Sequence, residues 1–186
     1  MNHKQPAGHT FLHPENILKE IGLSIGETIA DFGCGGGYFV IPAAKIIGDD
    51  GVAYGVDVLK NALSSLDVKS RMFGLTNVKP VWANVEIFGA SRGIHDNILD
   101  MVFLVQIMSQ SKKRREIFKE VDRVLKHNGG KIMVIDWKSD KLSFSPNPAS
   151  MTKPEEIKEI AKSFGLILEK EFEPSDYHFG LLLKRA

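Results

Sequence analysis

Glycine is concentrated at one point of this sequence, shortly after an acid. Gly33, Gly35, Gly36 and Gly37 lie within five positions, and Asp31 stands two residues before the first of them. Such a run suits neither a strand nor a helix interior, because glycine loses more backbone freedom on ordering than any other residue. It suits a tight turn whose backbone approaches a ligand, followed by a helix whose free N–H groups face that ligand. The run therefore predicts a loop that holds a nucleotide-like cofactor.

Polar residues elsewhere in the chain follow apolar runs that are typical of strands. They are Asp57 near the end of 52–58, Asn84 after 78–83, Gln106 after 98–105 and Asp136 near the end of 131–137. Ligands of an open parallel sheet bind beyond the carboxyl ends of its strands. We therefore expect these side chains to converge with Asp31 and the glycine run at one edge of a sheet.

Strands and helices alternate along the chain. The expected strands are 28–32, 52–58, 78–83, 98–105, 131–137, 166–172 and 178–184. The alternation predicts a parallel sheet covered by helices on both faces, and Pro80 places its strand at or near an edge. The turn between the last two strands is too short for a parallel crossover, so they must pair antiparallel. The helix before 131–137 is expected to begin at Ser111 as its N-cap.

The residues Asp31 to Gly37 resemble the first motif of the class I S-adenosylmethionine-dependent methyltransferases, an acid followed by GxGxG. The resemblance extends from the first helix to the last two strands. It implies an α/β fold, a Rossmann-like three-layer sandwich with a mostly parallel seven-stranded sheet and a C-terminal antiparallel hairpin. It also implies S-adenosylmethionine as cofactor, with its amino-acid end on the glycine loop and its ribose hydroxyls on Asp57.

Adenine contacts are implied near Asn84, a position where this family usually has an acid. The Asn84 carbonyl could accept from the adenine amino group, Val85 could offer its N–H to the ring, and Glu86 is a substitute acid. Asn84 is equally compatible with simple turn chemistry, and Gln106 with the lining of a substrate pocket. The cofactor-binding residues expected in this way are Asp31, Gly33, Gly35, Gly36, Gly37, Asp57, Val58, Asn84, Val85 and Gln106.

Other cofactor motifs fit this loop poorly. The dinucleotide fingerprint GxGxxG would put its third glycine at position 38 or 40, and those residues are Tyr38 and Val40. No Gly-Lys-Ser/Thr follows the glycines, which excludes a P-loop. Two alternatives to a methyltransferase stay open: a cofactor-binding module or pseudoenzyme that transfers no methyl group, and a small NAD-dependent oxidoreductase.

The expected reaction moves a methyl group from a sulfonium to a small-molecule acceptor by in-line displacement. Positioning and desolvation are then the main tasks of the protein, and a general base is not required. Asp136 and His13 are the candidates if one is used. Residues 1–12 are expected to form a flexible arm, and Phe11 is well placed to fold over the pocket.

Composition narrows the remaining possibilities. The 186 residues suit one domain over 1–186, and the net charge of +1 disfavours a nucleic-acid binder. A single cysteine, Cys34, permits no internal disulfide, and the six histidines show no ligand spacing, so no metal site is expected. No apolar run approaches about 18 residues and no signal peptide is evident, which favours a cytoplasmic protein without a membrane partner. The sequence gives no indication of oligomeric state.

Overall fold

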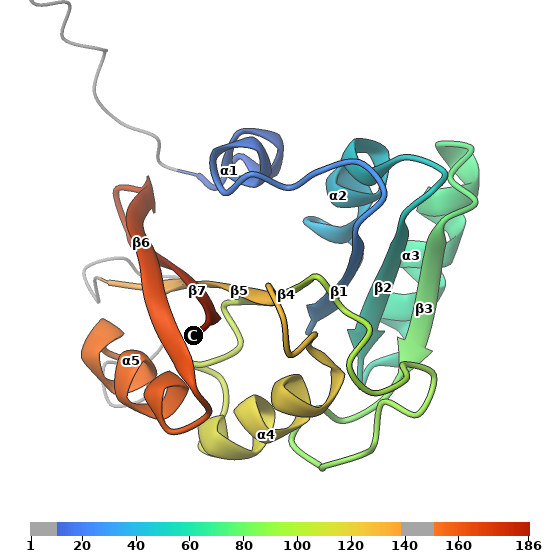
Figure 1. The fold of residues 1–186 in the computed structure, drawn as a ribbon. Helices are drawn as coiled ribbons and strands as arrows, with labels where there is room; N and C mark the ends of the chain where they lie inside the picture. The colour runs from blue at the N-terminus through green and yellow to red at the C-terminus, as the bar shows by residue number, and fades with distance from the viewer. Residues whose placement is uncertain (1–10, 139–150) are drawn as a thin grey trace, which may run out of the picture.

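A computed structural model of the chain describes residues 11–138 and 151–186 (Figure 1). Its strands are β1 (Thr28–Phe32), β2 (Val52–Asp57), β3 (Val78–Trp82), β4 (Met101–Val105), β5 (Lys131–Trp137), β6 (Leu166–Ser175) and β7 (His178–Arg185). Its helices are α1 (Pro14–Glu20), α2 (Val40–Ile47), α3 (Lys60–Met72), α4 (Arg114–Val124) and α5 (Pro154–Lys162).

The strands form one sheet in the order β3-β2-β1-β4-β5-β7-β6. β1 to β5 are parallel, whereas β7 pairs antiparallel with both β5 and β6. This confirms the predicted seven-stranded sheet with its C-terminal hairpin, and β3, which contains Pro80, is an edge strand. The order reverses between β1 and β4, so the carboxyl ends of these two strands flank the crevice where such sheets bind ligands.

Helices cover both faces of the sheet, with α1, α2 and α3 on one side and α4 and α5 on the other (Figure 1). The central strands are apolar on both faces because each face lies under helices. In β4, Met101 and Phe103 pack toward α1, α2 and α3, while Val102 and Leu104 pack toward α4 and α5. This alternation follows from the two-residue period of a strand.

Two expected boundaries differ from the structure. The strand predicted over 98–105 begins at Met101, since Leu99 forms only an isolated bridge, to Leu125. The Asp100 carboxylate accepts the backbone N–H of Thr28 at 2.9 Å. The helix expected to start at Ser111 begins at Arg114, with Lys113 at the N-cap. The Ser111 hydroxyl does accept from the Lys113 N–H at 2.9 Å, but this bond orders the turn before the helix.

Candidate functional site

The glycine loop follows β1 directly and is tied to β2. The N–H groups of Gly33 and Cys34 both donate to the carbonyl of Val56, at 2.8 and 3.1 Å. Gly33, Gly35 and Gly37 have φ values of 80°, 52° and 91°, a region that side chains with a Cβ rarely occupy. Glycine at these positions therefore lets the loop turn back across the strand ends.

Asp57 holds this loop from the end of β2. One carboxylate oxygen accepts the Gly35 N–H at 2.9 Å, and the other accepts the Leu59 N–H at 2.9 Å. A carboxylate can accept about four hydrogen bonds, so both oxygens retain capacity for a ligand. The end of β2 and the glycine loop thus come together as the sequence predicts.

Asp31 lies behind the same loop and is 3% exposed. Burial, with a smaller contribution from the nearby Asp57 carboxylate, raises the pKa of its carboxyl to about 7, against the opposing effect of a hydrogen bond from the Val40 backbone. An acid with this pKa changes its charge near neutral pH. It can therefore meet a cationic ligand group as a carboxylate or donate as a neutral acid.

A cavity of about 280 Å³ opens on one side of Gly33, and we call it the polar cavity. It is lined by Asp57, Val58, Asn84, Val85, Glu86 and Ser111, among others. The Asn84 side-chain oxygen accepts the Glu86 N–H at 2.9 Å, which is the turn chemistry that competed with adenine binding in the sequence. Glu86 in turn accepts the Ser111 hydroxyl at 2.6 Å.

A second cavity, of about 410 Å³, lies on the other side of Gly33, and we call it the aromatic cavity. Gly33 and Val105 line both cavities. The described residues around the aromatic cavity are Phe11, Leu12, Asp31, Gly33, Cys34, Tyr38, Phe39, Val105, Gln106, Trp137 and His178. Phe11 and Leu12 thus lie over this cavity, as expected for the end of the N-terminal arm, whose first ten residues are outside the described part.

His178 is the main residue of the aromatic cavity that sequence reasoning missed. Its Nε2 lies 2.7 Å from the side-chain nitrogen of Gln106, and its ring lies 4.3 Å from the Trp137 ring, centroid to centroid. His178 begins β7, 72 positions after Gln106. A lone histidine in an apolar strand carries no local signal of such a contact, although the adjacency of β5 and β7 could have suggested it.

The two candidates for a general base lie outside both cavities. Asp136 is fully buried, and its oxygens accept the N–H groups of Ser109 and Trp137 at 2.9 and 2.8 Å. Burial raises its pKa, and the hydrogen bonds from Ser109 and Trp137 oppose that rise. His13 is the N-cap residue of α1 and lines a different groove.

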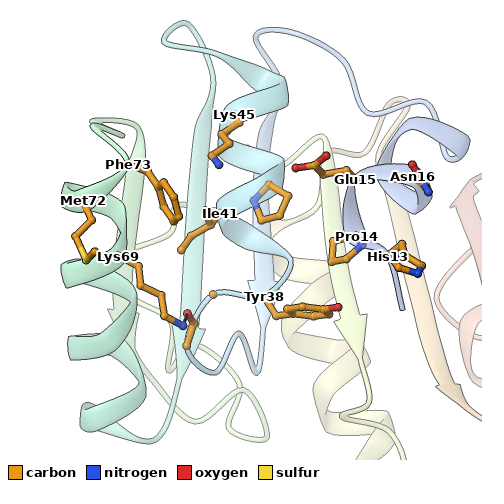
Figure 2. Close-up of a pocket in the computed structure, with 13 residues that line it drawn as sticks. His13, Pro14, Glu15, Asn16, Tyr38, Ile41, Lys45, Lys69, Met72 and Phe73 are labelled. Carbon is orange, nitrogen blue, oxygen red and sulfur yellow. Dashed lines mark hydrogen bonds between the residues drawn. The ribbon is translucent and has the colours of Figure 1, made fainter. Parts of the chain in front are cut away.

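That groove, of about 700 Å³, lies between α1, α2 and α3 (Figure 2). In Figure 2 His13 and Pro14 approach it from α1, and Met72 and Phe73 from the end of α3. Two of the glycines expected to bind cofactor, Gly36 and Gly37, line this groove and neither of the two cavities.

Tyr38 separates the groove from the aromatic cavity because it lines both. Its hydroxyl donates to the Leu12 carbonyl at 2.5 Å, which holds the chain before α1 over the aromatic cavity.

Residues 11–138 and 151–186 contain no group of three or more His, Cys, Asp or Glu side chains placed to hold a metal ion. Within the same ranges, none of the helices has the length and apolar character needed to cross a bilayer.

Residues 23–175 match the model of a protein family described as a methyltransferase domain, and the chain belongs to this family. The solved structure of a SAM-dependent methyltransferase from Aquifex aeolicus is 26% identical, with a TM-score of 0.83 over 94% of this chain and 90% of that one. These matches confirm the resemblance carried by the glycine loop.

The matches to curated relatives cover a smaller part of those proteins. The demethylmenaquinone methyltransferase of Geobacillus sp. (strain WCH70) is 28% identical over 122 residues, which are 66% of this chain and 50% of that enzyme. The chain spans about half the length of the curated relatives it matches. The solved structure of the [4+2]-cyclase SpnF shares the fold, with a TM-score of 0.75 at 14% identity over 92% of this chain and 80% of that one.

Proposed function

We propose that this chain binds S-adenosylmethionine across the carboxyl ends of β1, β2 and β4 and catalyses transfer of its methyl group to a small-molecule acceptor. The observation that carries the proposal is the glycine loop held on the Asp57 carboxylate, with Gly33 between a polar and an aromatic cavity. Membership of the methyltransferase domain family and the named relatives support it.

The residues present fit such a cofactor. Asp57 keeps free lone pairs for a pair of ribose hydroxyls, while Val58, Val85 and Glu86 line the polar cavity where a nucleoside would lie. A Cβ at Gly33 would come within 3.1 Å of Ile107, so the close passage between the cavities depends on glycine. Asp31, Cys34 and Gln106 surround the start of the aromatic cavity, where the amino-acid end and the sulfonium would lie.

S-adenosylmethionine supplies a methyl group already activated by its sulfonium charge. The protein must therefore bind, orient and exclude water, and it need not generate a strong nucleophile. Phe11 and Leu12 line the aromatic cavity and contribute apolar surface to it. Asp31, with a pKa of about 7, is the ionisable acid of that cavity and can receive a proton at neutral pH. Asp136, whose oxygens are engaged by Ser109 and Trp137, has the role of bracing the loop after β4.

A binding module without transfer activity is the second candidate. The Asn84 side-chain oxygen, which would accept from adenine, already accepts the Glu86 N–H, and this favours weaker nucleoside recognition than the family acid would give. The fold also occurs in a protein named for a cyclase reaction. Fold alone does not define the chemistry.

Isothermal titration of the full chain with S-adenosylmethionine and with its demethylated product tests binding. Asp57→Ala should weaken both affinities by roughly 10- to 100-fold, which corresponds to the loss of one or two charge-assisted hydrogen bonds. Asp50→Ala is the matched control, because Asp50 is an exposed turn acid at the opposite end of β2. Failure of the unmodified chain to bind either molecule would contradict the proposal.

Transfer itself is tested with methyl-labelled S-adenosylmethionine and a panel of small acceptors. Labelling of an acceptor supports the enzyme, whereas tight binding without labelling favours the binding module.

We further propose one domain over residues 1–186, supported by the continuous sheet, and a cytoplasmic location, supported by the single cysteine. Limited proteolysis and cell fractionation test these two points.

A further inference from the structure

A buried polar network forms one wall of the aromatic cavity. His178 is 4% exposed, and both of its ring nitrogens are engaged: Nε2 with the Gln106 amide at 2.7 Å and Nδ1 with the Ser175 hydroxyl at 2.7 Å. The amide nitrogen can only donate, so the His178 Nε2 accepts and the ring proton lies on Nδ1. Burial lowers the pKa of His178 to about 4, with a further contribution from Lys138, so the ring is neutral at pH 7.

The network fixes the conformation of Gln106. This residue has a left-handed backbone, with φ at 54°, which is uncommon for a residue other than glycine and is found at functional sites. Its N–H donates to the Ile135 carbonyl at 2.7 Å, and its own carbonyl accepts the Gln110 side chain at 2.5 Å. With the amide nitrogen held by His178, the backbone and side chain of Gln106 are both immobilised.

One atom of Gln106 remains without a partner. Within the described residues the side-chain oxygen makes no hydrogen bond, and Gln106 lines the aromatic cavity. A carbonyl oxygen held in place at a cavity wall is a preorganised acceptor for an O–H or N–H group of a ligand. A ligand without such a donor would leave this oxygen desolvated and unpaired, which costs about 1–3 kcal/mol.

The other residues that line the cavity indicate the shape and charge of that ligand. Phe11, Tyr38, Phe39 and Trp137 contribute rings, and the Trp137 ring packs on that of His178. No lysine or arginine is among the described lining residues, and the acid that lines the cavity is Asp31. None of the described lining residues therefore supplies a counter-charge for an anionic ligand. A flat, uncharged ring would instead pack against the aromatic walls.

We propose that the aromatic cavity selects a neutral aromatic acceptor that carries a hydroxyl group, and that this hydroxyl donates to the side-chain oxygen of Gln106. His178 is the positioning residue: it holds the amide through Nε2 and supports the ring of Trp137 from behind. The proposal rests on the proposed function, of which it names the acceptor class.

Fluorescence of Trp137 provides a test that needs no natural substrate. The chain contains two tryptophans, so Trp82→Phe, in the edge strand β3, leaves Trp137 as the reporter. This variant is saturated with the demethylated cofactor and titrated with phenol, anisole, cyclohexanol and benzoate. Phenol should bind about tenfold more tightly than anisole, the value of one hydrogen bond. It should also bind more tightly than cyclohexanol, which lacks a ring to pack, and than benzoate, which is charged.

Two further variants, made in the Trp82→Phe protein, test the roles of Gln106 and His178. Gln106→Leu removes the acceptor and should bring the ratio of phenol to anisole affinity close to one. His178→Phe keeps a ring against Trp137 but removes the nitrogen that holds the amide, and it should lower the same ratio several-fold. Binding of the demethylated cofactor, measured by titration calorimetry, shows whether each variant remains folded. A general loss of structure would lower all of these affinities together.

Several outcomes would overturn the proposal. They are equal binding of phenol and anisole, tighter binding of cyclohexanol or benzoate, no binding of any aromatic compound, and an unchanged ratio in Gln106→Leu. Each can be observed while the cofactor product still binds, so the failure of this inference is distinct from failure of the proposed function. Absence of cofactor binding would instead contradict the proposed function itself.

Discussion

The polar and aromatic cavities adjoin at Gly33, but their polar groups are held in different ways. In the polar cavity, Asp57 bonds the N–H two residues ahead of it, and Asn84 does the same. In the aromatic cavity, Gln106 is held by His178, 72 positions away. The polar cavity thus combines these local turns with contacts from Asp57 to Gly35 and from Glu86 to Ser111, 22 and 25 positions apart. The contact between Gln106 and His178 in the aromatic cavity instead forms only once β7 has joined the sheet.

This difference predicts how each region responds to substitution. A local turn restores most of its backbone geometry without the side chain, so its loss costs about 1 kcal/mol. A buried contact between distant elements leaves its partner unpaired, and its loss costs several times more.

The largest effect is expected at Glu120 of α4, which makes long-range contacts to the segment after β3. Its buried carboxylate bonds Arg123 and the N–H groups of Gly89 and Ser91, which hold the segment after β3 against α4. Glu120→Ala should lower the free energy of unfolding by about 3–5 kcal/mol, because the N–H groups of Gly89 and Ser91 lose their acceptor and the Arg123 guanidinium keeps only Asp96 as a carboxylate partner. Urea denaturation measures this, with the exposed Glu116→Ala on the same helix as control. A loss below about 1 kcal/mol would show that local turns suffice here.

A somewhat smaller effect is expected from Asp31, the acid of the aromatic cavity. Its native pKa of about 7 is far above the ordinary value of 3.8, so between these pH values the native state holds a proton that the unfolded chain has released. Stability from this group therefore falls as pH rises from 4 to 7 and is constant above that. Asp31→Asn removes the effect, so its gain in stability over the unmodified chain should be about 4 kcal/mol larger at pH 8 than at pH 4.

Urea denaturation of both proteins across that pH range measures the difference. Parallel stability curves for Asp31→Asn and the unmodified chain would contradict the raised pKa. Asp31→Asn should also weaken cofactor binding at pH 8, since a carboxylate is lost beside the site of the amino-acid end. Stability and binding thus change in opposite directions, as expected where an acid is buried for function.

An intermediate effect is expected in the loop that both cavities share. At Gly37 a Cβ would lie 2.7 Å from a methyl group of Leu66 and 3.0 Å from one of Ile41, and φ is 91°. Gly37→Ala should therefore cost about 2 kcal/mol of unfolding free energy. Gly35→Ala is the matched comparison, because a Cβ there meets nothing within 4 Å, and the left-handed backbone alone should cost about 1 kcal/mol. Equal losses in the two variants would show that contact with α3 is unimportant.

The features that the sequence could predict are those set by local patterns, and the ones it missed depend on contacts between distant segments. Short patterns express the glycine loop, the acid Asp57 and the alternation of strands and helices, and Pro80 correctly placed β3 at the edge. The N-cap of α4 was misplaced by two residues, at Ser111 instead of Lys113; the Ser111 hydroxyl donates to Glu86 of another segment, 25 positions away.

No local sequence pattern predicts the contact between Gln106 and His178. It arises because β7 inserts between β5 and β6, which brings a histidine beside the end of β5 and next to Trp137. Such contacts follow from the register of an antiparallel pair, which sequence periodicity alone does not define.

The smallest effect is expected at Asn84, whose side chain is already engaged in a local turn. Its side-chain oxygen already accepts the Glu86 N–H, so it offers adenine little beyond what the backbone of Val85 provides. Asn84→Ala should weaken binding of the demethylated cofactor by less than about fivefold, within 1 kcal/mol. Asn84→Asp retains the turn and adds a charge, and it should bind at least as tightly as the unmodified chain. Titration calorimetry on both variants measures these affinities. A 100-fold loss in Asn84→Ala would mean that the Asn84 amide leaves its turn to bind adenine. Binding in the polar cavity would then also depend on a contact that the local sequence does not predict.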